Sequence, residues 1–368
     1  MTIWLARPER PTAGLPVAIK DLLDTIGLVT TYGSILFAEH VPKQSAESVL
    51  RLEAAGYGVA GKTNLHEFAY GISSQNEHFG TVPNPRYPGH LAGGSSGGSA
   101  AAIAAGDVDL ALGSDSGGSI RIPAAWCGIV GFKPTYGLVP ADGCFPLAPS
   151  YDHVGPMAAS VEGCSELMRA LVPGFEPAAV ESLEEVEVGT AWLDEADPLI
   201  RERVREAASR FPRSRPVDFG FPDPAENKLF MREVADVHRG LYPEYADDYG
   251  EGIRWKLELC AAVSDGEVAT AERLRAEYRE RCEEVFDGLD LLLTPTMASV
   301  APPADADERE LRGRGIRFTY PFDCLGWPAL AIPCGLAEDG LPSSVQLVGR
   351  PGDDARVLAV GSRLASPV

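Results

Sequence analysis

Two glycine-rich serine clusters, separated by a run of small residues, constrain this chain more than any other feature of its sequence. They lie in the segment Gly93–Pro134, which reads GGSSGGSAAAIAAGDVDLALGSDSGGSIRIPAAWCGIVGFKP. Ser95 and Ser96 stand in the first cluster, and Ser119 stands in the second. Glycine at this density serves backbone conformations that a side chain would forbid, or the close approach of another group. The pattern therefore predicts two loops whose backbone N–H groups face a ligand.

Packed elements are expected to carry both loops. Ser99–Ala105 is rich in alanine and predicts a helix, and the short apolar stretch Val108–Leu112 predicts a buried strand. Loops held between such elements suit a rigid site better than a flexible linker does.

A serine hydroxyl is a poor nucleophile until a base takes its proton, and that base can be a lysine. The chain has few lysines, namely Lys20, Lys43, Lys62, Lys133, Lys228 and Lys256. Lys20 ends the apolar run Leu15–Ile19, so we expect it at the tip of a buried strand, where burial lowers the pKa of an ammonium group. The alternative is a surface lysine that pairs with Asp21.

The serine clusters and this lysine resemble the amidase signature family, serine hydrolases that cleave amides with a Ser-Ser-Lys triad. The family motifs GGSSGGS and GTDxGGSIRxP are matched by Gly93–Ser99 and Gly113–Pro123, with the family's spacing between the two key serines. The family's lysine strand is matched by Ala18–Asp21. The resemblance is strong over residues 13–156, weak through the middle, and returns from residue 289 to the end.

The resemblance implies a role for each residue of the triad. Ser119 would be the nucleophile, Ser95 the bridging serine that follows a cis peptide bond from Gly94, and Lys20 the base. The implied oxyanion hole consists of the backbone N–H groups of Ser116, Gly117 and Gly118, together with that of Ser119 itself.

Four further residues are candidates for the substrate pocket: Tyr70, Gly71, Ser96 and Arg121. Arg121 has two interpretations, a buried ion pair that holds the loop or a contact to an anionic substrate. The first is favoured because the arginine of the SIR motif is widespread in the family whatever the substrate.

The fold class implied is α/β, with the amidase signature fold: a central mixed β-sheet covered by helices on both faces, as one domain over residues 1–368. We expect a shortened, irregular lead-in over residues 1–13 and a short variable helical region at about 175–286. Other elements expected from the pattern are helices at 45–56 (with Ser45 as N-cap), 160–172 and 353–364, strands at 57–63, 289–295 and 341–349, and a buried strand or turn at 126–133.

Composition and charge exclude several classes of function. The net charge of −21 argues against binding to phosphate backbones, so no nucleic-acid partner is expected, although one local arginine would suffice for a small anionic ligand. The N-terminus lacks an apolar signal region, and no run is long enough to span a membrane. The seven cysteines are odd in number and form no CxxC, which predicts reduced thiols in a cytoplasmic protein. The scattered histidines predict no metal, no cofactor is expected, and a homodimer is left open.

Two further motifs match patterns of other enzyme classes without their structural context. Gly56–Thr63 fits the P-loop pattern GxxxxGK[ST], but the expected order there is helix, turn and strand, whereas a P-loop follows a strand and opens a helix. Gly93–Gly97 fits the GxSxG nucleophile elbow, but the residues before it cannot form the required strand.

The function expected is hydrolysis of small amides, which are then the small-molecule partner; carbamates, ureas and esters remain open as substrates. One alternative is the transamidating A subunit of a tRNA-dependent amidotransferase, against which the acidic balance counts. The carboxylate that such proteins place before the late TxPxNLxGxPA segment is not evident here, where the sequence has Ile316 and Arg317. In that segment Asp323 stands where the family usually has asparagine, so its hydrogen bonding must differ. An NTP-binding protein that uses Gly56–Thr63 is the alternative from another class.

Overall fold

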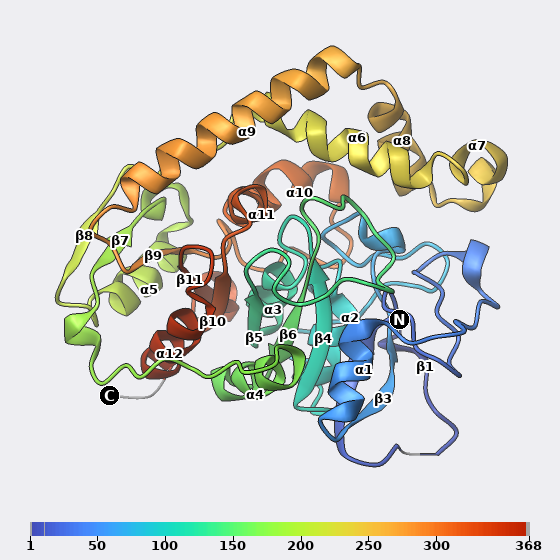
Figure 1. The fold of residues 1–368 in the computed structure, drawn as a ribbon, viewed down its shortest axis with the longest axis horizontal. Helices are drawn as coiled ribbons and strands as arrows, with labels where there is room; N and C mark the ends of the chain where they lie inside the picture. The colour runs from blue at the N-terminus through green and yellow to red at the C-terminus, as the bar shows by residue number, and fades with distance from the viewer. Residues whose placement is uncertain (1, 11, 366–368) are drawn as a thin grey trace.

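One mixed sheet of eleven strands organises the chain (Figure 1). The computed structural model describes residues 2–10 and 12–365, with the side chain of Arg312 left out. The strand order is β1-β3-β2-β4-β6-β5-β10-β11-β9-β7-β8, with parallel pairs around β2 and β7 and antiparallel pairs between β4 and β9. The strands are β1 (Trp4–Ala6), β2 (Leu15–Lys20), β3 (Tyr57–Thr63), β4 (Leu110–Asp115), β5 (Val130–Lys133), β6 (His153–Ala158), β7 (Val188–Thr190), β8 (Ser214–Pro216), β9 (Leu291–Pro295), β10 (Ala329–Leu336) and β11 (Pro342–Val348).

Helices cover both faces of the sheet. On one face α1, α4, α5 and α12 bury apolar side chains in a shared core with the strands, and on the other face α2 and α3 do so. Helices α6, α8 and α9 form an arch beside these layers, with α10 and α11 between the arch and the sheet (Figure 1). The helices are α1 (Glu47–Ala54), α2 (Gly97–Ala104), α3 (Arg121–Cys127), α4 (Val161–Leu171), α5 (Pro198–Ala208), α6 (Asn227–His238), α7 (Tyr242–Tyr245), α8 (Glu251–Ala261), α9 (Asp265–Val285), α10 (Glu308–Gly315), α11 (Tyr320–Leu325) and α12 (Asp354–Ala365).

Small residues let α2 lie close to the sheet. Its alanines from Ala100 to Ala102 are fully buried against β2, β4 and β6. At its start, a Cβ on Gly98 would lie 2.2 Å from the carbonyl oxygen of Asn64, so only glycine fits there. The predicted alanine helix and the mixed sheet are thus both present, and they place the first serine cluster against the strand that leads to the second.

Three local expectations differ from the structure. The lead-in at 1–13 contains β1, which pairs with β3. The segment 126–133, expected to be a strand or turn, begins with the end of α3 at Cys127 and only then becomes β5. Ser45 does not cap α1, because its hydroxyl accepts the backbone N–H of Ile26 at 3.0 Å and Ala46 takes the N-cap position.

The P-loop match has no room for a phosphate. Lys62 is fully buried at the end of β3, where its ammonium group lies 3.4 Å from the carboxylate of Asp21. It also donates to the hydroxyl of Thr30 at 2.9 Å. The short 3₁₀ turn Glu67–Ala69, rather than a P-loop helix, follows the strand. Asp21 is therefore the partner of Lys62, and the surface pair between Lys20 and Asp21 does not form.

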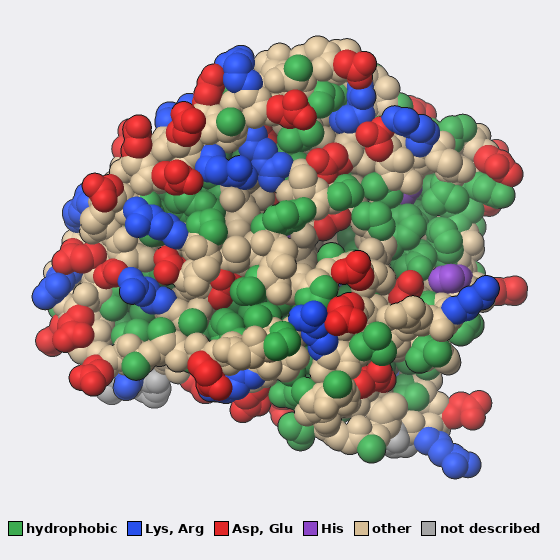
Figure 2. All heavy atoms as spheres, viewed as in Figure 1, with side chains coloured by type: hydrophobic (Ala, Val, Ile, Leu, Met, Phe, Trp, Pro, Cys, Tyr) green, Lys and Arg blue, Asp and Glu red, His purple; other side chains and the backbone are tan. Residues whose placement is uncertain are grey.

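Acidic side chains outnumber basic ones in the chain, and Figure 2 shows them spread over the face in view rather than gathered on one element. Within residues 2–10 and 12–365, no helix combines the length and apolarity needed to cross a membrane.

Candidate active site

Strand pairing brings the lysine and the second serine cluster to the same edge of the sheet. β2 runs parallel to β4, with Ile19 opposite Leu112, so both strands end toward the same side. β2 ends at Lys20, and β4 ends at Asp115 and continues into the loop that carries Ser119. Ligands of α/β proteins bind beyond the carboxyl ends of parallel strands, and this is where the two meet.

Lys20 is fully buried between two serine hydroxyls. Its Nζ lies 2.7 Å from Oγ of Ser95 and 2.8 Å from Oγ of Ser114. Burial lowers the pKa of this lysine to about 7, while Asp115 and Asp152 act in the opposite direction. The neutral amine is therefore accessible near pH 7, which is what a lysine needs if it is to accept a proton.

The first serine cluster has tightly packed glycines. The peptide bond between Gly94 and Ser95 is cis, the geometry that the family resemblance predicts. A Cβ on Gly94 would lie 2.7 Å from the hydroxyl oxygen of Ser74, closer than real contacts allow. The carbonyl of Ser95 accepts the backbone N–H of His66 at 3.2 Å, so the loop is fixed to the segment that follows β3.

Ser119 is only 8% exposed and lies on a loop tied to the first cluster. Its carbonyl accepts the backbone N–H of Ser96 at 3.2 Å. Between the hydroxyls of Ser95 and Ser119, no hydrogen bond is formed in the described part of the chain. Catalytic hydrogen bonds are often long before substrate binds. The two loops are therefore in place, and the contact between the hydroxyls of Ser95 and Ser119 is the one that is not yet made.

Asp115 holds the loop between β4 and α3 through its carboxylate. It accepts the backbone N–H groups of Gly118 at 2.5 Å and Ile120 at 3.1 Å, and it pairs with the guanidinium of Arg121 at 3.0 Å. Burial would raise the pKa of Asp115, but Arg121 holds it well below the usual range. The N–H of Gly118 thus already has a partner in this geometry, and its oxyanion role stays a prediction.

The other N–H groups of this loop remain available. Within residues 2–10 and 12–365, the backbone N–H groups of Ser116, Gly117 and Ser119 make no hydrogen bond. The side chain of Ser116 instead donates to the carboxylate of Asp152 at 2.5 Å. A site for a developing negative charge can therefore use up to three of the four donors that the sequence predicts.

Similarity to known proteins agrees with this geometry. The family model described as "Amidase" matches residues 4–210 and 225–358. This chain belongs to the amidase family. The A subunit of the glutamyl-tRNA(Gln) amidotransferase from Haloarcula marismortui is 34% identical over 97% of this chain and 96% of its own length.

Two solved structures share the amidase fold closely. A crystal structure of an amidase has a TM-score of 0.86 and 33% identity, covering 95% of this chain and 83% of its own. The A subunit of the glutamyl-tRNA(Gln) amidotransferase from Thermotoga maritima has a TM-score of 0.84 and 30% identity, covering 98% of this chain and 86% of its own.

Arg121 is fully buried, and its guanidinium bonds to protein groups. One nitrogen donates to Asp323 at 2.6 Å, and another donates to the carbonyl of Thr319 and to the side chain of Gln346 at 2.9 and 2.8 Å. Arg121 therefore forms a buried ion pair that holds the loop, which is the interpretation that the sequence favoured. Nothing in these contacts supports the alternative, a contact between Arg121 and an anionic substrate. Asp323 thus accepts a charged donor where the family usually has an amide.

Of the other three pocket candidates, two pack against protein groups and one lines the wall of a cavity. Ser96 is fully buried, and its hydroxyl donates to the carbonyl of Ser114 at 3.1 Å, which joins the two clusters. Gly71 packs against His66, with room for no side chain. Tyr70 lines a cavity of about 540 Å³, and its hydroxyl lies 3.3 Å from Sγ of Cys260. Of these three residues, Tyr70 is the one that lines this cavity.

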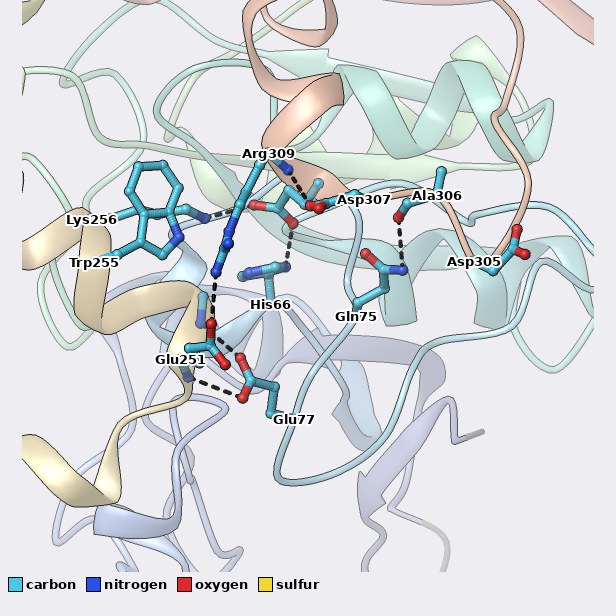
Figure 3. A pocket seen from close by; sticks show the side chains of 12 residues that line it. His66, Gln75, Glu77, Glu251, Trp255, Lys256, Asp305, Ala306, Asp307 and Arg309 are labelled. Atoms are coloured by element: carbon cyan, nitrogen blue, oxygen red, sulfur yellow. Dashed lines mark hydrogen bonds and ion pairs between the residues drawn. The ribbon is translucent and has the colours of Figure 1, made fainter.

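A second, more polar cavity of about 480 Å³ lies between α8, α10 and the segment after β3 (Figure 3). On its wall Glu308 accepts from Lys256 at 2.6 Å and from Ser73 at 2.5 Å, and it lies 3.2 Å from Nδ1 of His66. Burial lowers the pKa of His66 to about 4, so this imidazole is neutral at pH 7. The cluster fixes α10 to the core.

Sequence reasoning missed Ser114 and Asp152. Ser114 provides the second hydroxyl that contacts Lys20. It lies within the motif Gly113–Pro123, near the end of β4, and the neighbouring strand β2 ends at Lys20. Asp152 directly precedes β6 and reaches Ser116 because β6 pairs with β4, so nothing in the linear sequence connects the two residues. No group of three or more histidine, cysteine, aspartate or glutamate side chains is arranged to hold a metal ion in the residues that the structure describes.

Proposed function

We propose that this amidase cleaves the C–N bond of a carboxamide through an acyl-enzyme on Ser119. The observation that carries the proposal is the fully buried Lys20, whose Nζ lies 2.7 Å from Oγ of Ser95 at a cis peptide bond. A lysine that is neutral near pH 7 and in contact with a serine has the properties of a general base in a Ser-Lys arrangement.

In the proposed reaction, Oγ of Ser119 attacks the amide carbonyl as its proton passes to Ser95, and Ser95 gives its own proton to neutral Lys20. The backbone N–H groups of Gly117 and Ser119 are free to stabilise the tetrahedral oxyanion, a contribution often worth a factor of about a hundred or more in rate. The protonated relay then donates to the leaving amine as the C–N bond breaks. Water attacks the acyl-enzyme by the same route and regenerates Ser119.

The curated relatives support a second candidate, the A subunit of a glutamyl-tRNA(Gln) amidotransferase. In that case the chain would be one subunit of an assembly with partner subunits that acts on glutamyl-tRNA(Gln). The similarity over nearly the full length of the Haloarcula marismortui protein favours this candidate, whereas the net charge of −21 and the apolar Ile316 speak for a hydrolase that acts alone. Both candidates share the same first half-reaction at Ser119.

Ammonia or amine release by the purified chain tests both candidates. The panel contains glutamine, aliphatic and arylalkyl amides, a carbamate and a urea, each with wild type, Ser119→Ala and Ser209→Ala, an exposed serine outside the site. A hydrolase turns over several amides without partners, and Ser119→Ala abolishes this while Ser209→Ala does not. Glutamine cleavage that requires added partner proteins supports the amidotransferase. Wild-type turnover that persists in Ser119→Ala overturns the proposal.

A further inference from the structure

The cavity of about 540 Å³, here called the Tyr320 cavity, begins one side chain away from the loop that carries Ser119. Its apolar walls are formed chiefly by Tyr70, Phe221, Met231, Leu259, Ile316 and Tyr320. A Cβ on Gly117 would lie 3.8 Å from the ring of Tyr320, and the hydroxyl of Thr319 donates to the carbonyl of Gly117 at 2.6 Å. Thr319 and Tyr320 therefore connect this cavity to the loop that carries Ser119.

A buried carboxylate fixes the wall that the cavity shares with the loop. Glu226, fully buried on the turn before α6, accepts the hydroxyl of Tyr320 at 2.6 Å and the hydroxyl of Tyr151 at 2.5 Å. The two tyrosine rings stack with centroids 5.9 Å apart. The wall is thus held from both sides, and the cavity keeps its shape.

Three basic side chains line this cavity in a strongly acidic protein. Lys256, Arg309 and Arg317 line it, whereas Asp223 is the one carboxylate among its described lining residues. Arg317 lies over the ring of Phe221 at 4.1 Å. Each of these cations also has a carboxylate partner, so the cavity offers basic hydrogen-bond donors rather than an excess of positive charge.

The carboxylate partners of these cations stand outside the cavity lining. Arg317 contacts Glu195 through Nε, at 2.7 Å, and through Nη2. Arg309 donates to Glu251 at 2.8 Å (Figure 3), and Lys256 donates to Glu308 at 2.6 Å. Both guanidinium groups are about half exposed, and each has five N–H donors, so a carboxylate partner on one side leaves donors for a ligand.

We propose that the Tyr320 cavity selects substrate amides whose body is apolar or aromatic and ends in a carboxylate, with Arg317 as the side chain that recognises the carboxylate. This inference rests on the proposed amide cleavage at Ser119. The apolar walls, which include the fixed ring of Tyr320 beside the loop of Ser119, bind the body, and the guanidinium of Arg317 receives the charged end. Glutamine, with its short polar body, would leave the apolar walls unfilled.

A matched pair of substrates tests the inference: 3-(4-carboxyphenyl)propionamide and 3-(4-methylphenyl)propionamide. The readout is the ratio of their kcat/KM values for wild type, Arg317→Gln, Arg317→Lys and the control Arg205→Gln. Arg205 is an arginine of similar exposure that pairs with Asp194 away from the cavity. Wild type should prefer the carboxylated amide, and Arg317→Gln should lower the ratio by about tenfold, mainly through KM. Arg317→Lys should restore part of the ratio, and Arg205→Gln should match wild type.

Two outcomes separate failure of the inference from failure of the proposed function. Equal kcat/KM values for the two amides, or a ratio that Arg317→Gln leaves unchanged, overturns the inference while amide cleavage stands. If neither amide is cleaved, calorimetric binding to Ser119→Ala decides. Tighter binding of the carboxylated amide, lost in Ser119→Ala/Arg317→Gln, supports the cavity as a binding site although the proposed reaction fails, and equal binding overturns it.

Discussion

A buried lysine between two hydroxyls is the residue-scale feature on which the site depends. The apolar run before Lys20 predicted its burial, and the family resemblance predicted its contact with Ser95. Neither could predict the contact with Ser114, because that contact arises from the parallel pairing of β2 with β4. The chemistry of one side chain is therefore set by a sheet register that the linear sequence does not display.

The lysine makes the pH dependence of activity a direct test. Because the neutral amine has to accept the proton, kcat/KM for an amide should rise with pH through about 7, the lowered pKa of Lys20, and level off above it. Lys20→Ala should remove nearly all turnover without unfolding the chain, as judged by circular dichroism. A wild-type pH profile that is flat between pH 5.5 and 8.5 would contradict the assignment of Lys20 as the base. Near-normal turnover by Lys20→Ala would contradict it as well.

The two aspartates on Arg121 should respond differently to amide substitution. Burial and the neighbouring Asp115 raise the pKa of Asp323, and Asp323→Asn keeps an oxygen acceptor for Arg121, so it should change the free energy of unfolding by no more than about 1 kcal/mol. A carboxyl whose pKa is raised by folding loses stability as pH rises, so the asparagine variant should gain on wild type toward alkaline pH.

Asp115→Asn is the contrasting change at the same guanidinium. It weakens the bonds to Gly118 and Ile120 and leaves the buried charge of Arg121 poorly compensated, at a cost of about 3–5 kcal/mol. Urea unfolding of both variants at two pH values measures the difference. Equal losses in the two variants would show that Asp323 is ionised.

At the scale of elements, the sequence predicts those helices and strands that periodicity and apolar runs determine. Strands β2, β3, β9 and β11 and helix α4 lie where expected, with Ser160 accepting the N–H of Gly163 as N-cap. The failures have tertiary causes. Strand β1 is short and exists through its pairing with β3, and Ser45 is drawn away from α1 by the N–H of Ile26. A pattern read along the chain contains neither partner.

Helix α10 borders both cavities, and its first residue, Glu308, anchors it to the core. Burial would raise the pKa of this carboxyl, but His66 and Lys256 lower it to about 2, so it is ionised at all working pH values. Glu308→Gln should cost about 3 kcal/mol of unfolding free energy, because the buried Lys256 loses its carboxylate, and it should speed hydrogen exchange over 305–315. The matched control is Glu310→Gln, an exposed residue of the same helix. Equal exchange in the two variants would contradict this role of Glu308.

The whole molecule carries 53 acidic against 32 basic side chains, and this imbalance acts on its stability as well as on its partners. Figure 2 shows acidic groups distributed over the visible face with fewer basic groups among them. Like charges on a compact chain repel one another, and unfolding relieves that repulsion by moving them apart. The Tyr320 cavity, lined by three basic side chains and one carboxylate, is where an anionic ligand would find guanidinium donors.

Salt should therefore stabilise the folded chain. Screening lengths fall from about 30 Å at 0.01 M to about 3 Å at 1 M ionic strength, so added NaCl weakens the repulsion between surface carboxylates while buried pairs such as Lys62 with Asp21 are little affected. The melting temperature should rise steadily from 0.02 to 1 M NaCl, and the rise should shrink near pH 4.7, the isoelectric point, where the net charge vanishes. Sucrose at matched osmolality is the control for solvent effects that do not depend on charge. A melting temperature that falls with NaCl at pH 7.5 would show that surface ion pairs, and not net repulsion, dominate the electrostatics of this fold.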